Sequence, residues 1–240
     1  MVGFSITNFK FIQKNSCGSF TLSIPSFHID KGELVFVYGG SGSGKSTFFN
    51  LLAGVKNSPI NNSTRSVFPK IEYVMHESKL LPWHKLNDNI RVINKLNGNI
   101  KNNSIKSVCE TFGLGSEILN MKSWQLSLGM RQRFEIAIAL SNNPNLIIFD
   151  EALSGIDSQN KNIVCKNVYE YIKQNSVAFL ATAHQISDIL RLAERVVLIE
   201  NGTLKDSILV TSCTVEERLN MTLDQLYSLP ESKILMNCFN

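Results

Sequence analysis

The sequence predicts an α/β fold in which a mostly parallel sheet surrounds a phosphate-binding loop. Residues 33–38 alternate as a strand does, 39–47 are glycine-rich, and 48–53 have a helical pattern, which is the strand–loop–helix order of a P-loop NTPase core. Strand and helix patterns also alternate over residues 146–200, as in the βαβ units of a parallel sheet. Residues 77–143 have helical periodicity without strand signals, which predicts an inserted α-helical subdomain.

Length and composition agree with one large α/β domain carrying an insertion. The chain has 240 residues, of which 43% are hydrophobic and 18% charged, and these fractions are typical of globular proteins. The net charge of +4 is mild and no dense Lys/Arg block occurs, so nucleic acid is not an expected partner. The longest apolar stretches, such as residues 177–181, are too short to span a membrane, and no secretory leader is expected.

The cysteines give no sign of an oxidising environment. They are odd in number, widely spaced and without a C-x-x-C pair: Cys17, Cys109, Cys165, Cys213 and Cys238. This pattern favours neither a disulfide framework nor a zinc site, so we expect the chain to work in a reducing cytosol.

The glycine-rich segment satisfies the pattern G-x-x-x-x-G-K-[ST]. Its members are Gly39, Gly40, Ser41, Gly42, Ser43, Gly44, Lys45, Ser46 and Thr47. Glycines let backbone N–H groups approach a phosphate chain, and the helix that follows adds its unpaired donors. Lys45 is expected to neutralise the β- and γ-phosphates, and the Ser46 hydroxyl to hold Mg²⁺. The alternative is a glycine-rich turn with a chance lysine, but the flanking strand and helix favour a nucleoside triphosphate site.

Further elements are expected along the chain. Runs of β type at 4–11, 20–29 and 34–38 predict an N-terminal antiparallel β-subdomain that leads into the loop. Residues 56–66 are rich in Asn and Ser and are predicted to be a surface loop. The remaining predicted strands are 71–75, 146–149, 177–181 and 196–200, and the predicted helices are 86–96, 105–112, 131–140, 158–174 and 186–193. We expect a nucleotide-binding domain over 1–204 and a tail over 205–240, with a terminal helix or two at 215–229.

A pair of carboxylates follows the apolar run at 146–149. Ligands bind at the carboxyl ends of strands in open parallel sheets, so Asp150 is expected to hold Mg²⁺ through its water shell. Glu151 would then serve as the general base for an attacking water. A strand that merely ends in acidic residues is the alternative, and pairing with the phosphate loop makes the functional interpretation the better one.

The sequence resembles the ATP-binding subunits of ABC transporters over roughly residues 4–202. Besides the loop and the carboxylate pair, residues 126–133 (LSLGMRQR) resemble the LSGGQ signature of that family. Residues 154–157 (SGID) match the loop after the catalytic carboxylate, and His184 matches the switch histidine. The order and spacing of these motifs agree throughout.

Three stretches resemble one branch of the family in particular. Residues 77–83 (ESKLLPW), 129–133 (GMRQR) and 188–197 (DILRLAERVV) look like the importers of nitrate, sulfonate and bicarbonate. The resemblance implies an ATP-hydrolysing subunit that works on the inner face of the cell membrane and is bound there to transmembrane permease subunits. The cluster of Leu80, Leu81, Pro82 and Trp83 suits such a docking surface, although burial within the insertion is an equal alternative.

The resemblance also implies a shared site. Two such subunits pair head to tail, as a homodimer or heterodimer, with ATP and Mg²⁺ between the loop of one and the signature of the other. Ser127 and Gly129 would then face the γ-phosphate, because the signature segment opens a helix at Met130. His184 would help to place the attacking water, and Asp157 would organise the dimer interface. Phe11 is the candidate for stacking on adenine.

The sequence departs from the family pattern at three positions. His76 stands where the family has a glutamine, Leu128 replaces the first glycine of the signature, and Ala152 replaces a proline after the glutamate. Leu128 adds bulk where the γ-phosphate is expected, and a histidine offers different reach and charge from a glutamine. We therefore expect a working transport ATPase that is slow. The alternative is a regulatory nucleotide-binding subunit of a heteromeric complex, with a weakened site.

Overall fold

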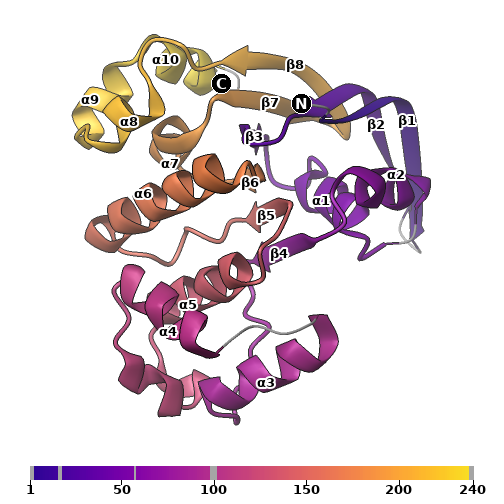
Figure 1. Cartoon of the computed structure of the whole chain (residues 1–240). Coiled ribbons are helices and arrows are strands. Elements are labelled where there is room, and N and C mark those ends of the chain that lie inside the picture. Colours follow the sequence, from indigo (N-terminus) through magenta and orange to yellow (C-terminus); the bar gives the residue numbers. More distant parts are fainter. Residues whose placement is uncertain (1–2, 16–17, 57, 98–101, 238–240) are drawn as a thin grey trace.

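The computed structural model describes residues 3–15, 18–56, 58–97 and 102–237. Within these ranges the strands form an eight-stranded sheet in the order β1-β2-β8-β7-β3-β6-β5-β4 (Figure 1). The strands are β1 (Phe4–Asn15), β2 (Gly18–Ile29), β3 (Leu34–Tyr38), β4 (Ile71–Met75), β5 (Leu146–Asp150), β6 (Ala178–Thr182), β7 (Arg195–Glu200) and β8 (Thr203–Leu209).

The centre of the sheet is parallel, as the sequence predicted. Strands β7, β3, β6, β5 and β4 pair in parallel along this row. Each is a short apolar strand whose side chains alternate between two cores: Leu34 and Phe36 face one, Val35 and Val37 the other. A sheet covered on both faces needs such continuous apolar strands, which explains why the predicted runs at 146–149 and 177–181 contain no polar residue.

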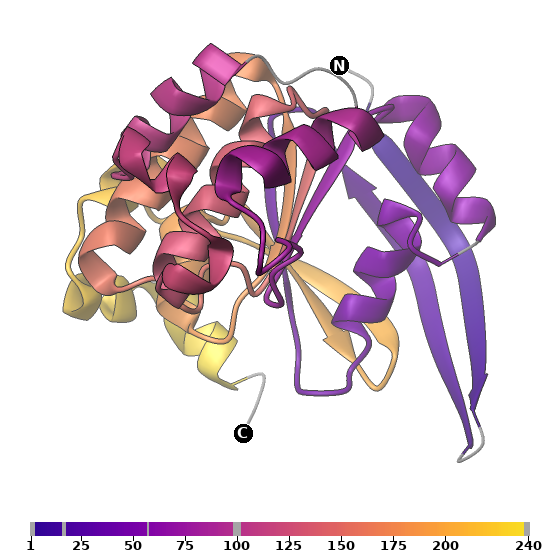
Figure 2. The ribbon, with the colours of Figure 1, turned by 90° about the horizontal axis from the view of Figure 1, so that it is seen from below.

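An antiparallel arm extends from one edge of the sheet. Strands β1 and β2 form a long hairpin whose ladder pairs Phe4 with Ile29 and Gln13 with Phe20. Figure 2 shows this hairpin reaching well beyond the central strands. It joins the rest of the sheet through β8, where Ser23 is paired with Thr203. The N-terminal antiparallel subdomain is therefore confirmed.

The helices cover the sheet from both sides. They are α1 (Lys45–Ala53), α2 (Pro59–Val67), α3 (Leu86–Asn97), α4 (Asn102–Thr111), α5 (Leu128–Ser141), α6 (Ser158–Asn175), α7 (Ile186–Leu192), α8 (Val215–Leu219), α9 (Leu223–Ser228) and α10 (Pro230–Asn237). Helices α1 and α2 share one core with the β1–β2 arm, whereas α3 to α10 contribute to the other. Helices α3 and α4, with the first turns of α5, form the inserted helical part at the bottom of Figure 1.

The prediction of a surface loop over 56–66 was wrong, because this stretch contains helix α2. The helix begins after Ser58 with Pro59 in its first turn, a position where a missing N–H costs nothing. Ile60 and Thr64 are buried, and the Thr64 hydroxyl donates a hydrogen bond to the Ile60 carbonyl at 2.8 Å. The abundant Asn and Ser residues of this stretch obscure an inward face that, among the described side chains, includes Ile60, Thr64 and the half-buried Val67.

The region after residue 200 is more ordered than its weak pattern predicted. Strand β8 pairs antiparallel with β7, so the boundary expected at residue 204 falls inside a strand. Helices α8, α9 and α10 follow, and Arg218 of α8 is buried where its guanidinium donates to the carbonyls of Leu190 and Ala193. The carboxylate of Glu231 accepts from the backbone N–H groups of Thr211 and Ser212, at 3.0 Å each.

Two further properties of the fold concern membrane-spanning helices and cysteines. No helix in the described part of the chain is long and apolar enough to cross a lipid bilayer. Of the cysteines, Cys109 and Cys165 are buried free thiols and Cys213 is a half-buried one, whereas Cys17 and Cys238 lie outside the described residues.

Candidate nucleotide site

The glycine-rich loop wraps around the side chain of Lys45. The Lys45 ammonium donates to the carbonyls of Gly39 at 2.8 Å and Gly40 at 2.9 Å. Burial lowers the pKa of Lys45, and the nearby carboxylates of Glu151 and Asp150 offset part of that effect. The loop therefore presents one buried cation within a curve of backbone, which is the arrangement that binds a phosphate chain.

Close packing at Gly39 and backbone conformation at Gly44 explain why glycine is needed at these two positions of the loop. A Cβ at Gly39 would lie 2.3 Å from the carbonyl oxygen of Ile199, well inside contact distance. Gly44 has φ 111° and precedes the first residue of α1, a backbone conformation that glycine adopts without strain. The loop is thus held between β7 and the arm while its outer edge stays open.

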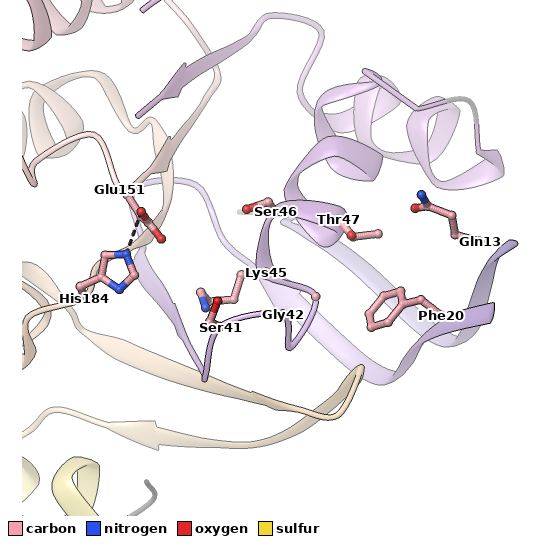
Figure 3. A pocket seen from close by; sticks show the side chains of 10 residues that line it. Gln13, Phe20, Ser41, Gly42, Lys45, Ser46, Thr47, Glu151 and His184 are labelled. Carbon is pink, nitrogen blue, oxygen red and sulfur yellow. Dashed lines mark ion pairs between the residues drawn. The ribbon is translucent and has the colours of Figure 1, made fainter. Parts of the chain in front are cut away.

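A cavity of about 340 Å³ lies beside the loop (Figure 3). It is lined by Gln13, Phe20, Ser41, Gly42, Gly44, Lys45, Ser46, Thr47, Glu151 and His184. In Figure 3, Glu151 and His184 lie on one side of Lys45 and Phe20 and Gln13 on the other. The cavity is therefore long and polar at one end, and carries an aromatic ring at the other.

Glu151 and His184 are in contact at the polar end. Nε2 of His184 lies 2.8 Å from Oε2 of Glu151 (Figure 3). Glu151 has φ 58°, an uncommon conformation for a residue other than glycine, and such positions cluster at functional sites. Its N–H donates to Oγ1 of Thr182 at 3.1 Å. The ends of strands β5 and β6 thus place a carboxylate and an imidazole together, a contact that the sequence alone did not predict.

Asp150 is fixed by two hydroxyl groups. Its carboxylate accepts from Oγ1 of Thr182 at 2.9 Å and from the Tyr73 hydroxyl at 3.0 Å. Burial raises the pKa of Tyr73, and the negative charge of Asp150 raises it further, so the phenol remains a proton donor. Neither Thr182 nor Tyr73 was predicted as a site residue, because the pairing of β4, β5 and β6 is what brings them to Asp150.

The donors present fit a magnesium ion rather than a transition metal. The Ser46 hydroxyl and the Asp150 carboxylate are hard oxygen ligands. In the described residues no group of three or more His, Cys, Asp or Glu side chains could hold a metal by itself. Mg²⁺ uses one or two protein ligands together with substrate phosphates and water, so a sparse oxygen set of this kind suits it.

The signature residues lie away from the loop cavity of their own chain. Helix α5 begins at Leu128, two residues earlier than the expected Met130, and Ser127 caps it by accepting from the Met130 N–H at 3.2 Å. Ser127, Gly129 and Asp157 are absent from the cavity lining, which includes only described residues. This placement agrees with a site completed by a second subunit.

Asp157 caps helix α6. Its carboxylate accepts from the Asn160 backbone N–H at 3.1 Å and from the Asn160 side-chain amide at 2.8 Å, and these bonds lower the pKa of Asp157. Arg133 of α5 donates to the same Asn160 side chain at 3.1 Å. The second turn of the signature helix is therefore linked through Asn160 to Asp157, the residue expected at the dimer interface.

The aromatic ring beside the cavity belongs to Phe20 and not to Phe11. Phe11 lies under the ammonium of Lys56, 6.0 Å from the ring centre, and does not line the cavity. Phe20 does, together with Gln13, its partner in the β1–β2 ladder. Both were missed because their nearness to the loop depends on the register of a long hairpin. His76 also lies outside the lining, and its Nδ1 is 3.0 Å from Oγ of Ser154.

The fold and the loop define a P-loop nucleotide-binding protein with a parallel sheet and an inserted helical part. The ABC transporter family profile matches residues 22–154. The aliphatic sulfonates import ATP-binding protein SsuB 2 of Pseudomonas fluorescens is 31% identical over 183 residues, 73% of this chain and 66% of that protein. SsuB 3 of Pseudomonas syringae pv. tomato is 31% identical over 193 residues, 76% and 68% of the two chains.

Solved structures give the same fold. A dimeric ATP-binding cassette in a post-hydrolysis state with ADP and Pi superposes with a TM-score of 0.75 at 22% identity, over 87% of this chain and 99% of that one. An ATP-binding subunit of an ABC transporter gives 0.74 at 20% identity, over 94% and 98%. The chain belongs to the ABC transporter ATP-binding family. The sequence matches span about two thirds of the length of the curated relatives.

Proposed function

We propose that this chain binds and hydrolyses ATP to power a transporter. The observation that carries the proposal is the Glu151–His184 pair, 2.8 Å apart, in the cavity that also holds Lys45 of the loop. A carboxylate, an imidazole and a phosphate-loop lysine in one cavity are the groups that water-mediated phosphoryl transfer requires.

Each side chain has a distinct part in the proposed reaction. The loop N–H groups and Lys45 hold the β- and γ-phosphates, and Phe20 and Gln13 flank the nucleoside end. Ser46 and Asp150 would hold Mg²⁺, which would neutralise charge on the phosphate oxygens. Glu151 accepts the proton of the attacking water, and His184 holds the Glu151 carboxylate in place. A second subunit supplies Ser127 and Gly129 from its signature segment.

Steady-state phosphate release by the purified dimer or assembled complex tests this activity. Replacing Glu151 with Gln keeps the side-chain shape but removes the base, and we expect release to fall by about 100-fold or more. Glu170→Gln is the matched control, because Glu170 lies on α6 with a half-exposed side chain far from the cavity. If wild type is no faster than Glu151→Gln, hydrolysis is not the role of this chain.

We further propose that the helical part binds a transmembrane permease. Leu80 is buried, but Trp83 is 66% exposed and Trp124 62% exposed. These two tryptophans lie close together, because the backbone N–H of Trp124 donates to the carbonyl of Pro82, the residue before Trp83, at 3.4 Å. Exposed neighbouring tryptophans are typical of protein interfaces. This contact would bring the chain to the inner face of the cell membrane without a spanning helix of its own.

A groove of about 450 Å³ extends this surface between β4, α3 and α5. Its apolar wall includes Leu81, Val92 and Ile138, which suits a helical segment of the partner. The double variant Trp83→Ala, Trp124→Ala is expected to lose co-purification with the permease while the free subunit keeps its ATPase rate. Loss of both properties would point to misfolding instead of docking.

The relatives suggest an importer of the sulfonate, nitrate or bicarbonate type. The two Pseudomonas relatives described above are named aliphatic sulfonates import ATP-binding proteins. The identity of 31% supports this branch without naming a solute. Identifying the membrane protein that co-purifies with the chain, and then measuring uptake of aliphatic sulfonates, tests the branch directly.

A regulatory subunit in a heteromeric complex is the second candidate. Leu128 favours it, because a side chain that is 44% exposed stands at the start of α5 where a glycine is expected. A paralogous subunit with an intact signature in the purified complex would support this candidate. A symmetric homodimer that hydrolyses both bound ATP molecules would exclude it.

A further inference from the structure

The turn at Ser154–Gly155 is contacted by Leu128 and His76, the two residues that depart most from the family pattern. It lies between Glu151 and Asp157, just after β5. Leu128 reaches it from the start of α5, and His76 reaches it from the end of β4. The two departures come from distant parts of the sequence, so their meeting at one turn is a property that only the fold reveals.

Leu128 packs directly on the backbone of Gly155. A Cβ built at Gly155 would lie 2.6 Å from both Cγ and Cδ2 of Leu128, whereas carbon atoms in contact are about 3.5–4.0 Å apart. The leucine side chain therefore occupies the space that any side chain at residue 155 would need. Gly155 does not have a positive φ, so its backbone would accept alanine. The conflict is with Leu128 first and with Oε1 of Gln132 second, which would lie 2.8 Å from the Cβ.

The backbone of the turn is also held by the signature helix. The Gly155 N–H donates to Oε1 of Gln132 at 2.9 Å, and Gln132 is only 1% exposed. A Cβ at Gly129 would lie 2.9 Å from the Gly155 carbonyl oxygen. The first two turns of α5 thus contact Gly155 through its N–H, its Cα and its carbonyl.

His76 holds the other residue of the turn. Its Nδ1 lies 3.0 Å from Oγ of Ser154, and the Ser154 N–H donates to the Glu151 carbonyl at 3.1 Å. Glu151 has the left-handed conformation described above, with φ 58°. Ser154 and the proposed base Glu151 are therefore joined by a hydrogen bond within one short segment. A shift of Ser154 would accordingly move the backbone of Glu151.

We propose that Leu128 and His76 are positioning residues that hold the Ser154–Gly155 turn, and that Leu128 is matched to the missing side chain at Gly155. Through the turn they set the position of Glu151 on one side and Asp157 on the other. Leu128 lies over its own turn and leaves the capped N-terminus of α5 open. The effect on Glu151 rests on the proposed ATP hydrolysis, whereas the Leu128–Gly155 match does not.

A double-mutant cycle between residues 128 and 155 tests the match. Gly155→Ala is expected to lower kcat about tenfold in the wild-type background and about threefold in Leu128→Ala, where only the contact with Gln132 remains, with KM for ATP unchanged in both. The KM stays because the phosphate loop is untouched. Loss of folded protein would also lower the apparent kcat at constant KM, so the folded fraction is measured by circular dichroism and kcat is expressed per folded subunit. Leu223→Ala is the control background, because Leu223 is also the exposed first residue of a helix capped by a hydroxyl.

Thermal unfolding of the same four proteins gives a readout that needs no ATPase activity. Gly155→Ala is expected to lower Tm by about 5 °C with Leu128 present and by much less with Ala at position 128. Equal effects in the two backgrounds would overturn the match. If wild type releases no phosphate while Tm shows the coupling, the proposed function and the positioning of Glu151 fail, and the packing match stands.

Variants at His76 test the second contact. Asparagine places a polar atom near the position of Nδ1, so His76→Asn is expected to keep kcat within about threefold of wild type, whereas His76→Ala loses about tenfold. Ser154→Ala should lower kcat to a similar degree, and the His76→Ala, Ser154→Ala double variant no further. Additive losses, or an asparagine variant as slow as the alanine variant, would overturn the role of His76.

Discussion

The phosphate loop and the Ser154–Gly155 turn are built in opposite ways. The loop comes from one contiguous stretch, and Gly39, Lys45 and Gly44 contact each other or β7 at close range. The turn is assembled from β4, α5 and the segment after β5, whose residues are distant in sequence. A contiguous site keeps its pattern because each residue serves the ligand directly. An assembled site tolerates an unusual residue where a neighbour leaves room for it, as Gly155 does for Leu128.

The largest expected effect lies in the loop. Lys45→Ala removes the only ammonium that the described loop encloses, between the carbonyls of Gly39 and Gly40. ATP affinity should fall by more than about 100-fold, because charge-assisted bonds to phosphate are the strong ones. Equilibrium binding of a fluorescent ATP analogue measures this, with Lys166→Ala on exposed α6 as the control. Retained affinity would mean that the loop backbone suffices.

The next effect lies at the junction of the two regions. Thr182 donates to Asp150 and accepts from the Glu151 N–H, so Thr182→Val removes both bonds with little change of volume. We expect kcat to fall by about 10- to 100-fold and the free energy of unfolding by about 1–3 kcal/mol. Thr182→Ser keeps the hydroxyl and should stay near wild type in both measurements. A valine variant with normal kcat would show that Asp150 and Glu151 are held by other contacts.

A third effect depends on pH and lies on β4. Burial raises the pKa of Glu72 to about 7 from 4.5, although the Asn142 side-chain amide donates to it at 2.8 Å and lowers it somewhat. The folded protein therefore binds this proton more tightly than the unfolded chain. The resulting stabilisation is complete below pH 4.5 and is lost as pH rises through 7.

Glu72→Gln removes this dependence while keeping an acceptor for Asn142. Urea unfolding at pH 5 and pH 8 should show the wild type losing up to about 3 kcal/mol relative to the variant between these values. Glu170→Gln, exposed on α6, should follow the wild type. Parallel curves for wild type and Glu72→Gln would mean that Glu72 is ionised in the folded protein throughout the range.

The smallest expected effect lies at the start of the signature helix. Ser127→Ala removes the acceptor of the Met130 N–H, which should lower the free energy of unfolding by about 1 kcal/mol. Ser127→Asp retains a capping oxygen and should recover the stability. If Ser127 also serves a γ-phosphate in a second subunit, the aspartate variant would be stable yet slow, because a carboxylate repels phosphate. Recovery of both properties would limit Ser127 to capping.

The contrast between the contiguous phosphate loop and the assembled turn also explains which parts of the site could be predicted from the sequence. The loop, the carboxylates after β5 and His184 follow strands whose apolar runs are unmistakable, so their meeting at one edge of the sheet was predictable. Phe20 and Gln13 needed the register of the arm, and Tyr73 and Thr182 needed the order of the strands. Helix α2 was missed because the few inward side chains described for it, such as Ile60 and Thr64, stand among polar neighbours.

The turn between β7 and β8 ties the nucleotide loop to late residues of the chain. The Gly202 N–H donates to the Ser43 carbonyl at 3.0 Å, and the Gly202 carbonyl accepts from the Ser23 N–H. Gly202 therefore joins the loop to the arm, and β8 up to Leu209 holds this turn in the sheet. A fragment cut at residue 200 would keep every recognised motif and lose the support of its phosphate loop. The smallest self-sufficient nucleotide-binding unit must accordingly extend through residue 209.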